Sequence, residues 1–187
     1  MNQALVYRRR RVAAGAAAAL LVVLGFGVFG SHGEVPVQGD QLGPDVEESR
    51  EAYIARVADS LADVDEDRYA LVSFTAPLTA QQASDALADV PRVSAMIVGA
   101  ASPVPLAEPV AGMTRADVFE LEFGRIDTAI AGIGELKNPR TISAVVVYAD
   151  GDVLRSLAAR DEVVAVDAAP ADAAWGSFGI RPLGSAG

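Results

Sequence analysis

Residues 12–30 constrain this chain most, because they form an uncharged, apolar run of 19 residues directly after the four arginines at positions 8–11. As an α-helix the run would be about 28 Å long, close to the hydrocarbon thickness of a bilayer, which is about 30 Å. Basic residues flank membrane spans on the cytoplasmic side. The sequence therefore predicts a single-pass protein of the cell membrane, with a cytoplasmic N-terminus, residues 12–30 in the lipid bilayer and an extracytoplasmic C-terminal domain.

A cleaved signal peptide is the alternative interpretation of the same run. It would share the basic start, and residues 28–30 or 31–33 could serve as a small-residue cleavage site. The apolar core of a signal peptide usually spans about 7–15 residues, which is shorter than this run. We therefore favour a retained signal-anchor. Both interpretations deliver the same domain to the same side of the membrane.

Charge and cysteine content exclude several classes of function. The arginines at positions 8–11 are the only charged residues among the first thirty, so 11 of the 15 basic residues and all 25 acidic residues follow, a net charge of −14. An acidic domain repels polyphosphates, which excludes nucleic acid as a partner. The chain has no cysteine, which excludes disulfide bonds, thiol catalysis and cysteine-ligated metal.

The predicted organisation has five segments. Glycine, proline and glutamine without hydrophobic periodicity indicate a tether after the membrane span, and a Gly/Pro composition indicates a tail at the end. We expect a basic cytoplasmic tail at 1–11, a transmembrane helix at 12–30, a tether at 31–43, an α+β ectodomain at 44–168 and a tail at 169–187. Trp175, Phe178 and Ile180 indicate that this tail packs partly on the domain.

The first half of the ectodomain shows one helix followed by a strand–helix–strand unit. A capping-box spacing at Asp45 and Glu48 predicts a helix over residues 44–61. Its predicted apolar stripe consists of Val46, Tyr53, Ile54, Val57 and Leu61. The unit that follows is predicted as a strand at 69–74, ended by Ala76-Pro77, a helix capped by Thr79 and Gln82, and a strand at 93–98.

The second half repeats this unit after an inserted helix. Residues 99–112 hold three prolines and predict an exposed connection. Spacings of 4, 3, 4 and 3 predict a long helix, capped by Thr114 and Asp117, whose stripe is Phe119, Phe123, Ile126, Ile130 and Ile133. The second unit is predicted as an apolar strand at 142–148, a helix capped at Asp150-Gly151-Asp152, and a strand at 162–166.

Two strand–helix–strand units in one domain predict a ferredoxin-like α+β fold. The compact solution is a four-stranded antiparallel sheet with both crossover helices on one face. The helix over residues 119–133 would be an insertion between the units, and the helix over residues 44–61 would pack at a sheet edge or on the open face. The predicted core consists of Leu71, Val72, Phe74, Val93, Ile97, Val145, Val147, Leu154, Leu157 and Val164.

Several segments carry a resemblance to a known family. Ala144-Val145-Val146-Val147, Leu157-Ala158-Ala159-Arg160, the strand at 163–166 with Asp167, and Arg181-Pro182-Leu183 resemble an uncharacterised family of actinobacterial single-pass membrane proteins, over residues 5–183. The resemblance implies no activity. Members of that family often carry cysteine near the start of the third strand, where this chain has Thr141, so no redox role is expected. The second unit also resembles, more loosely, subtilisin-type propeptides and their inhibitor relatives.

The groups needed for common catalytic chemistries are missing from the sequence. His32 is the only histidine and falls in the predicted tether, which excludes a histidine-based triad or a histidine-rich metal site in the ectodomain. Lys137 is the only lysine and falls in a predicted loop, which does not desolvate it for a Ser–Lys dyad. The chain has no G-x-S-x-G, P-loop or G-x-G-x-x-G motif. We expect no catalytic residue and no bound cofactor.

Three alternating carboxylates, Asp63, Asp65 and Asp67, match the start of an EF-hand calcium loop. The next loop position should be glycine and is Arg68, and the twelfth should be a bidentate glutamate and is Phe74. Without these supports the three carboxylates are typical of a solvated helix end. We therefore expect no metal site.

Two classes of function remain. The favoured one is a membrane-tethered extracytoplasmic interaction or regulatory module of the cell envelope that binds a protein partner without catalysis. A propeptide-like protease inhibitor would be a more specific version of this interaction module. The alternative is an envelope enzyme that uses carboxylates or serine. The expected contact surfaces are the open sheet face, the helix over residues 119–133 and the tail around Trp175, although Trp175 and Phe178 could equally fill the core.

Overall fold

The computed structural model of the protein describes residues 40–132 and 137–183. All of them belong to one compact unit, Val37–Gly187. The predicted cytoplasmic tail, membrane span, alternative cleavage sites and most of the tether lie outside the described residues. Within the two described ranges, no helix is long and apolar enough to cross a membrane.

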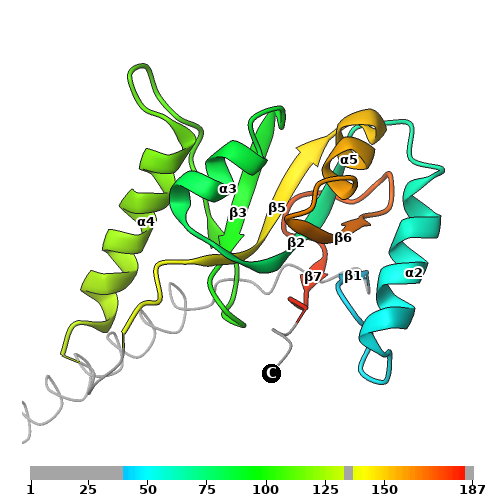
Figure 1. Ribbon diagram of the computed structural model, residues 1–187, viewed down its shortest axis with the longest axis horizontal. Coiled ribbons are helices and arrows are strands. Elements are labelled where there is room, and N and C mark those ends of the chain that lie inside the picture. The colour runs from blue at the N-terminus through cyan, green and yellow to red at the C-terminus, as the bar shows by residue number, and fades with distance from the viewer. Residues whose placement is uncertain (1–39, 133–136, 184–187) are drawn as a thin grey trace, which may run out of the picture. The chain divides into compact units, whose positions relative to one another are not determined.

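The fold is a mixed α+β arrangement built on a five-stranded sheet (Figure 1). Its strands are β2 (Arg68–Leu78), β3 (Arg92–Ile97), β4 (Val104–Pro105), β5 (Ile142–Ala149) and β6 (Val163–Ala168). Their order is β4-β3-β5-β2-β6, and every neighbouring pair is antiparallel. A second sheet consists of β1 (Gln41–Leu42) and β7 (Gly179–Ile180), which are parallel. The predicted α+β class is therefore confirmed.

Each of the four described helices begins at a residue whose side chain accepts a hydrogen bond from a backbone N–H of its first turn. The helices are α2 (Arg50–Leu61), α3 (Ala80–Ala86), α4 (Arg115–Ile130) and α5 (Gly151–Ala158), with N-caps Ser49, Thr79, Thr114 and Asp150. The predicted capping boxes of α3 and α4 are both present. Such caps each contribute about 1 kcal/mol, which explains why the starts of α3, α4 and α5 could be located from the sequence.

The strands bury side chains on both faces of the sheet, because successive residues point to opposite sides. Val72, Val145 and Val147 pack with apolar residues of α3, α4 and α5. On the other side Leu71, Ile97 and Val146 pack with Leu42 of β1 and with Phe178. Both faces of β5 are thus covered, as its almost wholly apolar sequence predicted. In Figure 1, α4 lies beside α3 and α2 lies beside β6.

The first helix begins later than predicted. It starts at Arg50, after the N-cap Ser49, and Val46 is 86% exposed and takes no part in the apolar stripe. Glu48 does accept a hydrogen bond from the Asp45 N–H, at 3.1 Å. This contact belongs to a turn before the helix, where the same Glu48 carboxylate also binds Arg56. The cap spacing was therefore real, but it marked a turn and not the first helical residue.

The predicted end of the first strand at Ala76-Pro77 is wrong, because β2 continues to Leu78. Its pairing with β5 shifts register between Ser73 and Leu78, and residues 75–77 in that interval are exposed. Proline lacks a backbone donor, so a sheet tolerates it where the ladder is interrupted. The predicted break assumed that a proline ends the strand. Because the register is irregular at residues 75–77, Pro77 can lie within β2.

Three short strands lie in segments for which the sequence predicted none. β4 falls in the predicted exposed connection, β1 in the predicted tether and β7 in the predicted tail. A strand of two residues shows no alternation, so periodicity cannot detect it.

Among the predicted core residues, Val164 is only half-buried and packs beside Tyr53 and Val57 of α2.

Candidate functional site

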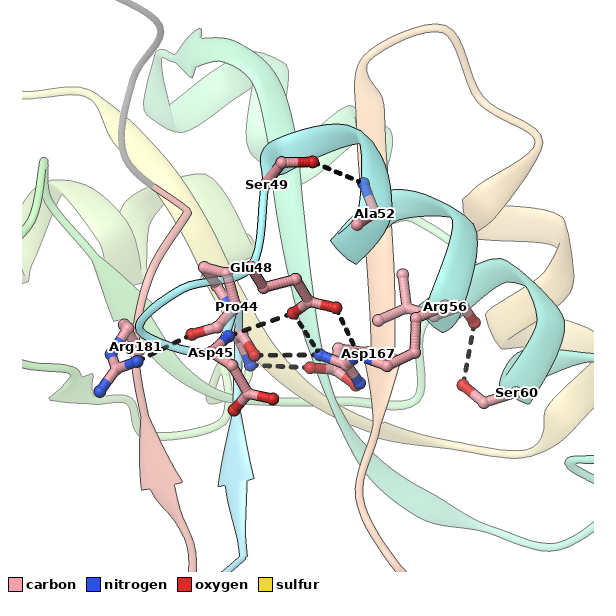
Figure 2. A network of polar contacts seen from close by, with 11 residues as sticks. Pro44, Asp45, Glu48, Ser49, Ala52, Arg56, Ser60, Asp167 and Arg181 are labelled. Atoms are coloured by element: carbon pink, nitrogen blue, oxygen red, sulfur yellow. Dashed lines mark hydrogen bonds and ion pairs between the residues drawn. The ribbon is translucent and has the colours of Figure 1, made fainter.

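A network of polar contacts joins the start of the described chain to its end (Figure 2). Asp167 of β6 is only 4% exposed, and its Oδ2 accepts a hydrogen bond of 2.7 Å from the Gly43 N–H. Gly43 follows β1 directly, so this bond links two segments that are 124 positions apart. We call residues 40–45 the N-terminal segment. Figure 2 shows the side chains of Glu48, Arg56 and Asp167 pointing toward one another beside it.

One guanidinium is shared by two carboxylates in this network. Arg56 donates to both carboxylate oxygens of Glu48, at 2.9 and 3.1 Å, and to the Gly43 carbonyl at 3.3 Å. Its closest approach to Asp167 is longer, 4.0 Å from Nη1 to Oδ1. The hydrogen bonds from Arg56 lower the pKa of Glu48, and the same bonds raise the pKa of Arg56. Arg56 is therefore engaged mainly with Glu48 and only partly with Asp167.

Burial governs the protonation of the other two groups in the network. Burial raises the pKa of the Asp167 carboxyl, although the Gly43 N–H, the charge of Arg56 and the Tyr53 hydroxyl all oppose it. Tyr53 is fully buried, and its hydroxyl lies near the Asp167 carboxylate without making a hydrogen bond of ordinary geometry. Burial, and then the charge of Asp167, raise the pKa of this hydroxyl above its ordinary value. The network therefore holds a poorly compensated carboxylate inside the fold.

Beside this network, the backbone of the N-terminal segment lies directly against the backbone of Arg181. Gly43 has a φ of +112°, and a Cβ at this position would lie 1.8 Å from the carbonyl oxygen of Arg181. Arg181 donates its backbone N–H to Leu42 O at 2.8 Å and its guanidinium to Pro44 O at 3.0 Å. These contacts hold the N-terminal segment against β7. They position no nucleophile and no opposed carboxylate pair, so we treat this network as structural.

A second constellation is aromatic and partly exposed. Tyr69 of β2 and Tyr148 of β5 are register partners, with ring centroids 4.8 Å apart. Trp175 and Phe178 lie 5.6 and 5.7 Å from the Tyr69 ring. Trp175 is 41% exposed, whereas Phe178 is 7% exposed. We call these four residues the aromatic patch. Phe178 therefore belongs to the core, whereas Trp175 is exposed at the surface and does not fill the core.

Hydrogen bonds between Ser177 and Ala174 close the turn that carries Trp175. The Ser177 hydroxyl accepts from the Ala174 N–H at 3.0 Å and donates to the Ala174 carbonyl at 2.7 Å, and the Ser177 N–H donates to the same carbonyl at 3.0 Å. Gly176, within this turn, has a φ of +83°, a conformation that favours glycine. The exposed indole therefore stands on an ordered support.

The remaining sequence candidates are dispersed. Asp63, Asp65 and Asp67 follow α2, and in the described part of the chain no group of three or more His, Asp or Glu side chains is placed to hold a metal ion. Phe74 lies inside β2 and is buried, as predicted. Lys137 is exposed in a loop. His32 lies outside the described residues. The outer face of α4 forms a shallow, open groove around Leu121 and Gly124.

Sequence reasoning missed most of both constellations. It singled out Trp175 and Phe178 but not Tyr69 or Tyr148, because these tyrosines fit the strand pattern of β2 and β5. The network around Asp167 was missed because its members come from four separate segments. The one available signal was an acidic residue directly after the valine-rich part of β6. Comparison with protein-family models, curated proteins and solved structures found no match to the chain.

Proposed function

We propose that the chain is a membrane-tethered, extracytoplasmic interaction module of the cell envelope, which binds a protein partner through the aromatic patch and carries out no catalysis. The observation that carries the proposal is the exposure of Trp175 on top of a partly buried aromatic base. Tryptophan and tyrosine are enriched at protein interfaces and among the residues that dominate binding energy. Their amphipathic rings bury a large area on binding while a polar group remains available for a hydrogen bond.

The support beneath Trp175 favours binding by reducing its entropic cost. Ordering a mobile side chain on association costs about 0.5–1.5 kcal/mol, and a side chain that is already ordered avoids this loss. Tyr69 contacts Trp175 from below, and the Ser177 hydrogen bonds restrain the turn from the side. An indole held in this way is suited to insertion into a pocket of a partner.

Membrane attachment would strengthen a weak contact of this kind. Two proteins confined to the same surface meet at an elevated effective concentration, so a small interface can act specifically. The proposal places residues 12–30 in the bilayer, with the following residues as tether. The uncharged run behind four arginines supports this placement.

We further propose that the central part of the sheet is ferredoxin-like. The order β3-β5-β2-β6 supports this arrangement, because β2 and β3 flank β5 while β5 and β6 flank β2. β2 connects to β3 through α3, and β5 connects to β6 through α5. In the sheet, a strand of the other unit lies between the two strands of each connection, as in a split strand–helix–strand unit. In this view α4 and β4 belong to an insertion between the two units, and α2 packs along the edge strand β6.

Photocrosslinking in the native host would test the proposed function. We expect a benzophenone amino acid at position 175 of the full-length protein to capture a discrete envelope protein. The matched control carries the same probe at position 121, because Leu121 is also exposed, at 50%, but lies on α4. Capture at position 121 and not at position 175 would move the contact site to α4. Capture at neither position would contradict the interaction module.

Two substitutions separate loss of binding from loss of folding. Trp175→Ala should abolish the interaction, measured by co-purification of the captured protein, with little change in melting temperature. Phe178→Ala should lower the melting temperature, because Phe178 is buried against Leu71 and Val146. If a soluble ectodomain rescued a deletion strain and the rescue depended on one or two carboxylates, the enzyme alternative would replace this proposal.

A further inference from the structure

We propose that the aromatic patch and Arg92 together bind an acidic segment of the partner protein, in which a carboxylate lies a few residues from a large apolar side chain. This inference rests on the proposed function, since it names the chemistry of the partner that the aromatic patch binds. Two observations carry it, namely the register of three neighbouring strands and the distribution of ion pairs over the domain.

Arg92 lies at the end of a row of side chains that leads to Trp175. Arg92 of β3 is the register partner of Tyr148 of β5, and Tyr148 is the register partner of Tyr69 of β2. Residues directly opposite each other on neighbouring strands project from the same face, with Cβ atoms about 4.5–5.5 Å apart. The ring of Trp175 lies 5.6 Å from that of Tyr69, at the other end of the row. Arg92 is exposed and both tyrosines are partly exposed, so a partner can reach the row.

Arg92 is not neutralised by the domain that carries it. Other arginines form ion pairs with carboxylates of the chain, namely Arg56, Arg125, Arg140, Arg155 and Arg160. Within the part of the chain that the structure describes, Arg92 makes neither an ion pair nor a hydrogen bond. The residues after position 30 hold 25 acidic and 11 basic side chains. An unpaired guanidinium beside the aromatic patch is therefore available to a carboxylate from another protein.

A carboxylate on a protein segment is the group that fits this row. A guanidinium binds a carboxylate through two parallel hydrogen bonds, which fix its orientation as well as adding affinity. Tryptophan and arginine are enriched among the residues that dominate binding energy at interfaces. An extended anionic surface, such as nucleic acid or anionic lipid, would be repelled by the net negative charge of the domain. A single carboxylate beside an apolar side chain meets mainly Arg92 and the aromatic rings.

The spacing of the strands sets the separation of the two partner groups. Neighbouring strands lie about 4.8 Å apart, so the backbones at Arg92 and Tyr69, with β5 between them, are separated by about 10 Å. An extended segment rises about 3.3 Å per residue, so this separation corresponds to about three residues. The carboxylate that contacts Arg92 should therefore lie about three residues from the apolar side chain that contacts Trp175.

Photocrosslinking from position 175 of the full-length protein in the native host, with the benzophenone probe, would test this inference. Arg92→Glu should reduce the capture yield at least severalfold, because like charges would then face each other across the interface. Arg92→Lys keeps the positive charge and should retain more capture than Arg92→Glu. Lys137→Glu is the matched control, since it makes the same change of charge at an exposed loop residue and should leave the yield unchanged. All three variants should keep the melting temperature of the parent chain, because both positions are exposed.

A charge exchange completes the test. Mass spectrometry of the captured peptide should find an aspartate or glutamate a few residues from the crosslinked position. Replacing that partner acid with lysine should reduce capture by the parent chain and restore capture by Arg92→Glu. Equal capture by the parent chain and Arg92→Glu, or a captured peptide without a nearby acid, would overturn the acidic partner while leaving the interaction module intact. Capture by none of the chains, or crosslinks to a glycan or lipid alone, would contradict the proposed function as well.

Discussion

Replacing Phe119 with alanine should lower the free energy of unfolding by about 3–5 kcal/mol, the usual cost of emptying a buried phenylalanine site. Phe119 is fully buried and belongs to the same core cluster as Leu87, the C-cap of α3, and Val72 of β2. The guanidinium of Arg115, one turn earlier, donates to the Val90 carbonyl at 2.8 Å, so α4 is held against the segment that follows α3. The cavity left by alanine could not collapse easily between these fixed elements. Urea denaturation followed by circular dichroism would measure the change.

Leu121→Ala is the matched control for this prediction. Leu121 lies two residues away on the same helix and is half exposed, so its removal should change stability by less than about 0.5 kcal/mol. A similar loss for both variants would mean that the effect comes from helix formation and not from packing. A negligible loss for Phe119→Ala would contradict the placement of α4 on the sheet domain.

Replacing Gly43 with alanine should cost about 2–6 kcal/mol, because two penalties act at the same position. A φ of +112° is strained for any residue with a Cβ, which costs about 1–3 kcal/mol. The added methyl group would also collide with the Arg181 backbone carbonyl, and overpacking of this kind costs about 1–3 kcal/mol. Relief of the collision requires β1 and β7 to separate. The variant should therefore lose hydrogen-exchange protection at residues 40–46 as well as overall stability.

Gly176→Ala separates the two penalties. Gly176 also has a positive φ, +83°, but an added Cβ would meet no atom within 4 Å. This variant should therefore show only the backbone cost, about 1–2 kcal/mol. Equal losses at positions 43 and 176 would show that the close approach of Arg181 contributes nothing, and would weaken the view that the N-terminal segment packs tightly against β7.

Patterns among neighbouring residues predicted the helices and the central strand β5. The spacing of Phe119, Phe123 and Ile126 located α4 and its inward face, whereas Ile133 lies outside the described residues. The capping residues Thr79, Thr114 and Asp150 each marked a helix start within one residue. The almost wholly apolar sequence of β5 correctly predicted burial on both sides. These features depend on contacts between residues a few positions apart, so the sequence displays them directly.

Features that depend on distant partners could not be predicted. β1 and β7 exist only because each pairs with the other, and two residues carry no period of their own. Asp167 is an ordinary acidic residue until Gly43 and Arg56 are placed beside it. Trp175 was recognised as a candidate because it is an aromatic residue in a predicted coil. Its support on Tyr69 required knowledge of the strand register.

The pairing of β1 with β7 has a consequence for the order in which the chain acquires its structure. During synthesis the N-terminal segment leaves the ribosome before the rest of the described residues, yet its partners Asp167, Gly179 and Arg181 are among the last of them to emerge. The helices and the β2–β3 region can form contacts earlier, because domains assemble as their residues become available. Closure of a loop of more than 100 residues is entropically unfavourable until the sheet holds both ends near each other. The beginning of the domain should therefore be the last part to become ordered, and a nascent chain truncated before Asp167 should hold its core while residues 40–45 remain unpaired.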